Sequence, residues 1–355
     1  MLGPHILAAL NGTDITPEIE ELILEHRILG FTLFKRNIQS ASQVQKLTSD
    51  LQAIAKKANY QLLLAVDQEG GRVARLSQPE FVKIPPMQKW AERFIDNNQA
   101  EDLFELGVML AEQTLSCGFN VDFAPVVDVN TISENPVIGD RSFGSDPQLV
   151  YVCARNVLRG MRKGGVISCI KHFPGHGATT KDSHLDLPID DRYESEILAS
   201  DVFPFQKLMA ESLVDSVMTA HVLYPSIDKN KPATVSQTII TNILRQDLNY
   251  QGVVFSDDMM MKAISDHYGI EKAVFDFFKA GGDAVLICEK PELTLDILEN
   301  FPEKEASLLT HQLEIAKNRL EMLKRRMIQP DENNHKNTFA HLVKRHQMII
   351  DNFFG

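Results

Sequence analysis

Short apolar segments alternate with longer stretches in which apolar residues recur at helical spacing over residues 5–290. A run of roughly four to eight apolar residues bounded by turn formers is typical of a buried strand, and a 3.6-residue period is typical of a helix packed on it. Eight strands are predicted, at 5–10, 31–34, 62–66, 121–127 (interrupted by Pro125), 166–170, 215–220, 252–255 and 283–287.

Helical patterns separate these strands. Thr16 and Pro17 give the first helix an N-cap and a proline in its first turn, and Gly30 ends it. Six more helices are predicted at 41–57, 101–117, 147–163, 194–211, 237–248 and 271–280. Strands alternating with helices form right-handed βαβ units and a parallel sheet, and eight of them fit a closed (β/α)8 TIM barrel. The alternative, an open doubly wound sheet, lacks its GxGxxG motif after the first strand.

Two further helices are predicted after the last barrel strand, at 308–327 and 338–353, separated by a break at Gln329-Pro330. Because this segment is short for a separate domain, we expect both helices to pack against the barrel wall. Residues 1–355 are therefore expected to form a single domain, with the barrel at about 5–300 and the extra C-terminal helices at about 303–355.

Composition narrows the functional classes. The chain has 355 residues, 44% hydrophobic and 24% charged, as in soluble globular proteins. Its net charge of −12 argues against a nucleic-acid partner. No apolar run approaches the ~18 residues of a membrane helix, and the N-terminus lacks the basic region of a signal peptide. The cysteines (117, 153, 169 and 288) form no CxxC pair and are expected to be reduced, which indicates a cytoplasmic protein.

The segment 166–188, VISCIKHFPGHGATTKDSHLDLP, carries the densest chemistry in the chain. It runs from a buried strand into a polar loop with Lys171, His172, His176, Asp182 and His184. Polar groups also follow the third, fourth, sixth and seventh strands, among them Asp67, Arg75, Arg141, His221 and Asp257. Active sites of TIM barrels lie at the carboxyl ends of the strands, so these groups are predicted to share one site. An ordinary polar surface loop is the alternative for 171–188.

Asp182 precedes His184 by two residues, and in extended backbone such residues share a face. Asp182 would then orient the imidazole and stabilise its protonated form, as a proton shuttle requires. The alternative is a surface pair without a role.

Asp257 and Asp258 close the seventh strand, and only one of them can point along the barrel axis. A carboxylate there can act as nucleophile, base, ligand or helix N-cap, and strand alternation does not choose between the two residues. Further donors and acceptors around the same opening are Asp67, Arg72, Arg75, Arg141, Lys171 and His172. They would bind a hydroxylated or anionic ligand, or else form structural ion pairs.

A metal site is the competing interpretation of the histidines. His172, His176, His184, His221 and Asp257 could serve as ligands in a barrel hydrolase. The first strand has no HxH motif, however, and Lys171 would place a cation beside the metal. No metal ligand is therefore predicted.

With these residues identified, the chain resembles glycoside hydrolase family 3, in particular the single-domain bacterial β-N-acetylglucosaminidases of peptidoglycan recycling. KHFPGHG at 171–177, followed by DSH at 182–184, is highly specific to that subgroup, and ILRQDLNYQGVVFSDD at 243–258 matches the general signature. The resemblance implies Asp257 as nucleophile and His184 as acid/base assisted by Asp182. It also implies that Asp67, Arg75, Arg141, Lys171 and His172 hold the sugar. Met260 departs from the usual small residue.

The resemblance further implies a retaining exo-β-N-acetylglucosaminidase that cleaves N-acetylglucosaminyl-anhydromuropeptides in the cytoplasm. Its expected partner is this carbohydrate, with no nucleic acid, no membrane, no metal and no organic cofactor, and the protein is expected to be a monomer. A family 3 β-glucosidase or β-xylosidase is one alternative, which the DSH motif disfavours. A catalytically inactive sugar-binding barrel is the other, which the intact Asp257, Asp182 and His184 disfavour.

Overall fold

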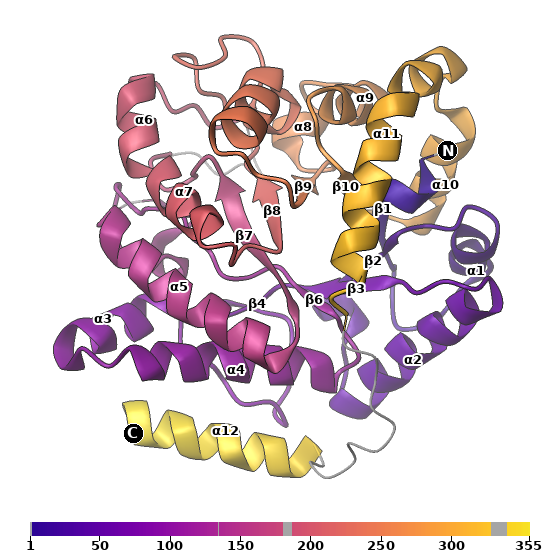
Figure 1. Ribbon diagram of the computed structural model, residues 1–355. Helices are drawn as coiled ribbons and strands as arrows, with labels where there is room; N and C mark the ends of the chain where they lie inside the picture. The colour runs from indigo at the N-terminus through magenta and orange to yellow at the C-terminus, as the bar shows by residue number, and fades with distance from the viewer. Residues whose placement is uncertain (1, 134, 180–186, 328–338) are drawn as a thin grey trace.

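The computed structural model describes residues 2–133, 135–179, 187–327 and 339–355. Within these residues eight parallel strands close a barrel in the order β1-β2-β3-β6-β7-β8-β9-β10, with β10 pairing back to β1 (Figure 1). The strands are β1 (Ile6–Ala9), β2 (Gly30–Leu33), β3 (Leu63–Val66), β6 (Val121–Asp122), β7 (Ile167–Phe173), β8 (Ser216–Thr219), β9 (Val253–Asp258) and β10 (Ala284–Ile287). The predicted (β/α)8 barrel is confirmed.

Helices surround the barrel. They are α1 (Pro17–Leu24), α2 (Ala41–Lys57), α3 (Met87–Asn97), α4 (Ala100–Ser116), α5 (Pro147–Gly164), α6 (Glu194–Ser200), α7 (Val202–Ala210), η5 (Thr238–Asp247), α8 (Lys262–Ser265), α9 (Ile270–Lys279), α10 (Pro291–Asn300), α11 (Glu303–Lys324) and α12 (Phe339–Phe354). Local sequence fixes the ends of α5. The Asp146 carboxylate caps α5 by accepting from the Gln148 N–H at 2.9 Å, and Gly165 ends α5 at a φ of 93° that favours glycine.

Most barrel strands contribute to two apolar layers because their side chains alternate in direction. Leu7, Leu63, Phe123, Ile167 and Phe255 are among the residues that fill the barrel interior. The intervening strand residues pack outward against the helices in a larger cluster. The interior packing leaves the carboxyl ends of the strands free to carry polar groups.

Helix α11 closes the opposite end of the barrel. Its Leu320 and Leu323 belong to the interior cluster. Its Arg319 donates from Nη1 to the buried Asp283 carboxylate at 3.0 Å, immediately before β10 begins. The apolar and ionic contacts together fix α11 across the amino ends of the strands.

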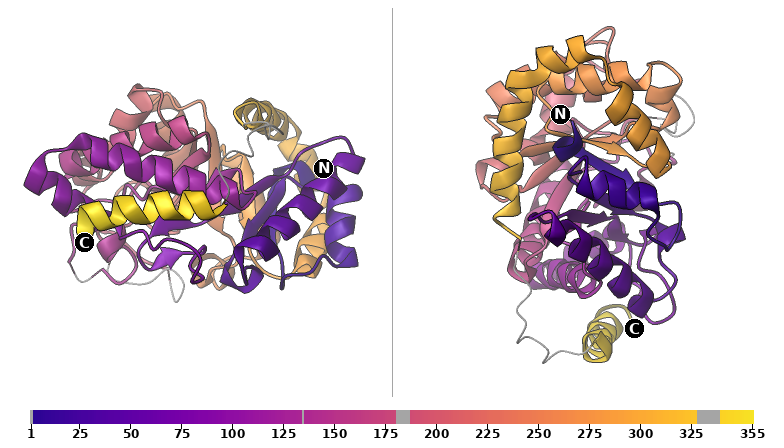
Figure 2. Two further views of the ribbon diagram at one scale, coloured as in Figure 1. Left: turned by 90° about the horizontal axis from the view of Figure 1, so that it is seen from below. Right: turned by 90° about the vertical axis from the view of Figure 1, so that its right-hand side faces the viewer.

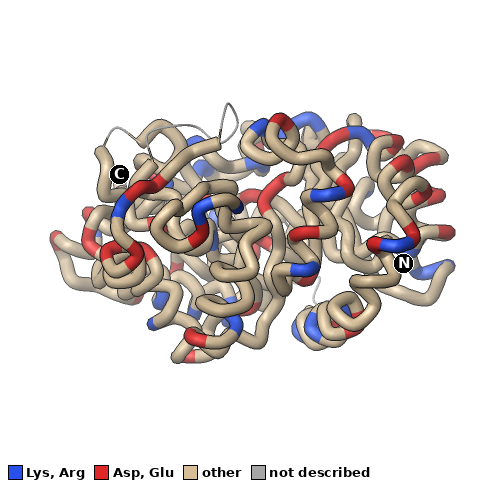
Figure 3. The backbone as a smooth tube through the Cα atoms, turned by 90° about the horizontal axis from the view of Figure 1, so that it is seen from above, with Lys and Arg blue, Asp and Glu red and all other residues tan. Residues whose placement is uncertain are grey.

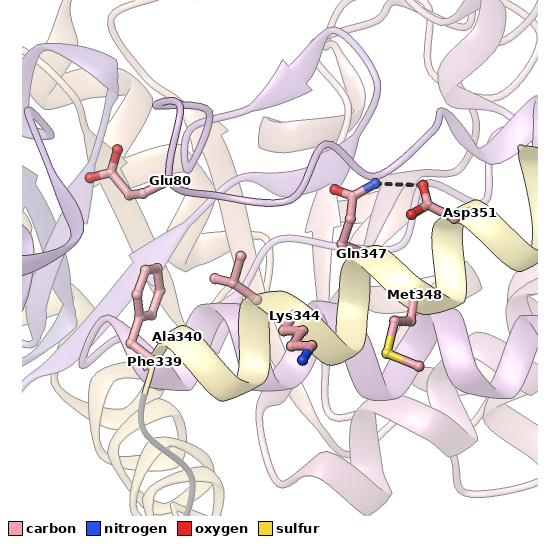
Figure 4. Close-up of a pocket in the computed structure, with 8 residues that line it drawn as sticks. Glu80, Phe339, Ala340, Lys344, Gln347, Met348 and Asp351 are labelled. Carbon is pink, nitrogen blue, oxygen red and sulfur yellow. Dashed lines mark hydrogen bonds between the residues drawn. The ribbon is translucent and has the colours of Figure 1, made fainter.

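Helix α12 packs on α4 and runs beside it in Figure 1, and Figure 2 shows α12 from two further sides. Its His346 is fully buried, with Nε2 2.8 Å from a Glu112 carboxylate oxygen on α4. Its Phe353 meets Trp90 of α3 edge-on, with ring centroids 5.8 Å apart. A hollow beside α12 is lined by Phe339, Met348 and their neighbours (Figure 4). The single-domain assignment of 1–355 stays a prediction, which these contacts support.

Some predicted boundaries were wrong. Strand β7 runs to Phe173, so Lys171 and His172 lie in the strand and not in the following loop. Strand β6 ends at Asp122, and beyond it the chain keeps separate main-chain contacts with its neighbours, such as Phe123 N–H to the Val66 carbonyl at 2.9 Å and a bridge from Val126 to Lys171, because Pro125 has no N–H to continue the ladder. The predicted helix 194–211 is divided at Asp201. The break follows Ser200 directly. In a continuous helix the ring of Pro204 would clash with the carbonyl of Ser200, four residues before it.

The structure also adds elements that were not predicted. A two-stranded antiparallel sheet, β4 (Gln68–Gly70) with β5 (Val73–Ala74), follows β3 directly, and α3 and α10 are additional helices. Acidic and basic positions are interspersed along the chain in the view of Figure 3. None of the described helices combines the length and apolarity that crossing a membrane requires.

Candidate active site

A cavity of about 460 Å³ opens at the carboxyl ends of the barrel strands. Its lining includes nine of the residues singled out in the sequence: Asp67, Arg72, Arg75, Arg141, Lys171, His172, His176, Asp257 and Asp258. The structure thus brings together groups that are far apart in the chain, from Asp67 to Asp258. Asp182 and His184 lie outside the described residues, so their predicted roles stay predictions.

A network of ion pairs forms one wall of this cavity. Lys171, only 3% exposed in its side chain, donates from Nζ to Asp67 Oδ1 at 2.7 Å and pairs with Glu69 Oε1 at 2.6 Å. Arg75 donates from Nη2 to the other Asp67 oxygen at 3.0 Å. Burial acts to raise the pKa of Asp67, but Lys171 and Arg75 outweigh it and hold the pKa below its ordinary value. Asp67 is therefore an ionised acceptor at neutral pH.

Glu69 is the centre of this network, and the sequence analysis missed it. Arg141 binds it through two parallel bonds, Nε to Oε2 and Nη2 to Oε1, both 2.8 Å long. The Glu69 side chain is 1% exposed. Burial acts to raise its pKa, and Arg141 and Lys171 together bring the pKa below its usual value. A signal was present, because Glu69 follows Asp67 by two residues and so shares its face in extended chain.

His172 is oriented by a second carboxylate that the sequence analysis missed. Asp128 is completely buried, and its Oδ2 lies 2.7 Å from Nδ1 of His172. Its Oδ1 accepts the main-chain N–H groups of His172 at 3.1 Å and His176 at 2.7 Å. A carboxylate on Nδ1 fixes the ring plane of His172 and directs Nε2 away from itself. The Asp128 carboxylate thus binds both His172 in β7 and His176 in the loop that follows β7.

The contacts of Asp257 and Asp258 distinguish two residues that strand alternation could not. Asp258 Oδ1 accepts the N–H groups of Met260 and Cys288, each at 3.0 Å, and burial raises the pKa of Asp258 to about 6. Asp257 accepts the Asp258 N–H at 2.8 Å. Burial acts to raise the pKa of Asp257 as well, but His221 and His172 outweigh it and lower the pKa. Asp258 is held by the main chain, whereas Asp257 is the carboxylate kept ionised within the cavity.

The cavity, its cations and an ionised carboxylate at a barrel strand end are the elements of a sugar-hydrolysing site. The model of the glycosyl hydrolase family 3 N-terminal domain matches residues 6–328. The chain belongs to glycosyl hydrolase family 3. As a member of this family it is a glycoside hydrolase.

Curated relatives of this family 3 hydrolase are named beta-hexosaminidases. The protein of Alkalilimnicola ehrlichii is 39% identical over 307 residues, which cover 86% of each chain. The protein of Neisseria meningitidis serogroup C is 38% identical over 299 residues, covering 83% of this chain and 81% of its own.

Solved structures agree. Native NagZ from Neisseria gonorrhoeae is 31% identical with a TM-score of 0.82, covering 99% of this chain and 98% of its own. A family 3 beta-N-acetylglucosaminidase from a Paenibacillus species is 32% identical with a TM-score of 0.87, over 98% of this chain and 68% of its own.

Proposed function

We propose that this family 3 hydrolase is a retaining exo-β-N-acetylglucosaminidase with Asp257 as its nucleophile. The observation that carries the proposal is the Asp257 carboxylate, kept ionised inside a cavity of donors and acceptors. The names of the curated beta-hexosaminidases and of the Paenibacillus beta-N-acetylglucosaminidase support the choice of sugar.

In the proposed reaction the Asp257 carboxylate attacks the anomeric carbon while the bond to the leaving oxygen breaks. His184 protonates that oxygen, so the aglycone departs as an alcohol. In the second step His184 takes a proton from water, the water oxygen attacks the same carbon, and the bond to Asp257 breaks. Two displacements retain the anomeric configuration. The roles of His184 and Asp182 come from the DSH motif.

The ion-pair wall is proposed to hold the N-acetylglucosamine ring. The Asp67 carboxylate would accept from ring hydroxyls, and Arg75, Arg141, Lys171 and His172 would donate to the sugar. Asp67, Glu69 and Asp128 hold these donors in place before the sugar arrives. Preorganised charged groups contribute about 1.5–3 kcal/mol per hydrogen bond.

The proposed substrates are N-acetylglucosaminyl-anhydromuropeptides, and the proposed setting is cytoplasmic peptidoglycan recycling by a monomer. The KHFPGHG and DSH motifs support the substrate class. Four free cysteines, three of them buried, are in keeping with a reducing compartment. The proposed chemistry needs no metal or organic cofactor.

A panel of aryl glycosides tests the activity. The N-acetylglucosaminide should be hydrolysed far faster than the glucoside or xyloside, and a muropeptide should release N-acetylglucosamine. Sugar binding without any turnover would instead support an inactive binding barrel, and faster hydrolysis of the glucoside would reassign the substrate.

Covalent trapping tests the nucleophile. A 5-fluoro glycosyl fluoride of N-acetylglucosamine should leave its label on the peptide that contains Asp257. Asp257→Asn should abolish labelling, and Asp258→Asn should retain it. A label on Asp258 would refute the assignment, and so would substrate assistance by the 2-acetamido group, which leaves no label.

A further inference from the structure

His221 is a buried imidazole immediately behind the proposed nucleophile. It follows β8 by two residues, is 0% exposed and is absent from the lining of the cavity. Its Nε2 lies 2.9 Å from the main-chain oxygen of Asp258, and its Nδ1 lies 2.7 Å from the Thr234 hydroxyl. Both ring nitrogens thus meet oxygen atoms of the protein.

The Thr234 hydroxyl has its own set of partners. It donates to the Ala220 carbonyl at 2.9 Å and accepts from the Thr219 hydroxyl at 2.9 Å. A threonine hydroxyl has one proton and two lone pairs. With its proton given to Ala220, Thr234 can only accept from the His221 ring.

These contacts determine the protons on His221. A carbonyl oxygen only accepts, so Nε2 must donate a proton to Asp258. Thr234 has no second proton to offer, so Nδ1 must donate as well. All the contacts are satisfied together only when both ring nitrogens carry protons, that is, when the ring is an imidazolium. A neutral ring would either require Thr234 to give up the Ala220 carbonyl or leave an unprotonated Nε2 facing the Asp258 carbonyl without a proton between them.

We propose that His221 is an imidazolium that positions Asp257, by fixing the Asp258 carbonyl in the main chain directly after Asp257 and by placing a buried positive charge beside the carboxylate. This inference rests on the proposed function, in which Asp257 is the nucleophile. Thr234 and the Asp258 carbonyl select the cation by accepting from both ring nitrogens. His221 acts through Asp257 and has no contact with the cavity of its own.

The surroundings of Asp257 agree with this charge. Among the groups that lower the pKa of Asp257 against the opposing effect of burial, His221 is the strongest, ahead of His172 and Lys171 on β7. Asp258, His176, Cys169 and Cys288 also interact electrostatically with Asp257 within the described part of the chain. Since the Asp258 pKa is raised, Asp257 is the carboxylate that best compensates an imidazolium.

The charge has opposite effects on the two chemical steps. A carboxylate of lower pKa is a weaker nucleophile but a better leaving group. Loss of the His221 cation should therefore slow release of the sugar from Asp257 more than its attachment. This separates His221 from a residue whose loss merely loosens the fold.

Nitrogen-15 NMR on histidine-labelled wild-type protein tests the protonation state without relying on activity. Spectra at pH 8 of the wild type and of His221→Gln identify the His221 signals by their loss. We expect both ring nitrogens to resonate as protonated nitrogens at pH 8, where an ordinary histidine is neutral. One protonated and one unprotonated nitrogen at pH 8 would overturn the proposal, whatever the identity of the nucleophile.

Kinetics test the effect on Asp257. A glutamine amide can still donate to the Asp258 carbonyl but carries no charge, whereas His221→Phe removes both. In His221→Gln the acidic limb of kcat/KM should move up by about one to three pH units, because Asp257 must be ionised to attack. His5→Gln is the matched control. It replaces another buried histidine, hydrogen-bonded to the Asp283 carbonyl at 3.0 Å, and should leave the acidic limb in place.

Three outcomes separate the inference from the function on which it rests. An unshifted acidic limb in folded His221→Gln, with Asp257 labelled as expected, would refute the electrostatic role alone. A protonated His221 with the label on another residue would refute the nucleophile alone. If His221→Gln fails to fold, Thr234→Val decides, since losing the Nδ1 acceptor should favour the neutral ring at pH 8, and an unchanged imidazolium there would contradict the proposal.

Discussion

Glu69 offers the sharpest test of how the charged wall of the cavity is built. It accepts from Arg141 through two bonds of 2.8 Å and pairs with Lys171 at 2.6 Å, and its side chain is 1% exposed. Glu69→Gln keeps the shape of the side chain but removes the charge and turns an acceptor into a donor. That amide N–H₂ then faces a buried cation.

The expected loss of stability in Glu69→Gln depends on the partners that Lys171 and Arg141 keep. Breaking a buried ion pair by removing one partner costs about 3–5 kcal/mol. Lys171 keeps Asp67 at 2.7 Å, and Arg141 keeps the Val137 carbonyl at 3.0 Å, so we expect the lower end, a loss of ~3 kcal/mol in the free energy of unfolding. If both cations also leave the sugar, each lost bond of ~1.5–3 kcal/mol lowers kcat/KM by roughly ten-fold or more.

Urea unfolding and kinetics on an aryl N-acetylglucosaminide measure the two effects separately, with kinetics recorded where the variant is fully folded. The control is the same substitution at Glu92, whose pairing with Lys89 at 2.7 Å lies on the surface. Glu92→Gln should stay within about 0.5 kcal/mol of the wild type. A Glu69→Gln protein as stable and as active as Glu92→Gln would refute the view that Glu69 organises the wall.

Three further predictions concern stability in acid, the packing of α11 at the amino ends of the barrel strands, and the role of His184 as acid/base. Because the folded pKa values of Asp67 and Glu69 lie below their ordinary 3.8 and 4.5, their stabilisation is complete above about pH 5 and is lost as the pH falls. The urea midpoint should therefore drop more steeply between pH 5 and pH 3 in the wild type than in Glu69→Gln, and parallel curves would contradict this. In urea unfolding, Leu320→Ala should lower the free energy of unfolding by about 2–5 kcal/mol. Met322 is 67% exposed on the same helix, so Met322→Ala should change this free energy by no more than about 0.5 kcal/mol. Equally small effects of both substitutions would exclude α11 from the core. His184→Ala should slow a natural disaccharide far more than a dinitrophenyl glycoside, with azide restoring the second step, and equal losses without rescue would refute its role as acid/base.

The sequence predicted what local pattern determines. Apolar runs located all eight strands, and the carboxyl ends of those strands located the polar residues of the cavity. The predicted ends of the strands were less accurate. Strand β7 continues through Lys171 and His172 because these polar side chains find partners in Asp67 and Asp128, and no local signal reports such partners. Propensity describes a segment alone, whereas a strand end is set by what the neighbouring strands offer.

The residues missed in the sequence are those whose importance comes from distant pairing. Glu69 meets Arg141 across 72 positions, and Asp128 meets His172 across 44. Such contacts depend on the barrel register, which places strand ends side by side irrespective of sequence separation. The break between α6 and α7 is a different case, because Pro204 was a visible signal of it.

The charge arrangement also bears on why a sugar ester at Asp257 would be short-lived. Five cations, Arg36, Arg72, Arg75, Arg141 and Lys171, and four carboxylates, Asp67, Glu69, Asp257 and Asp258, line one cavity. In the proposed intermediate Asp257 becomes an ester and loses its charge, so the net positive charge of the cavity rises by one unit. Release of the sugar restores the Asp257 carboxylate, and the same electrostatics that keep Asp257 ionised at rest therefore favour the second chemical step.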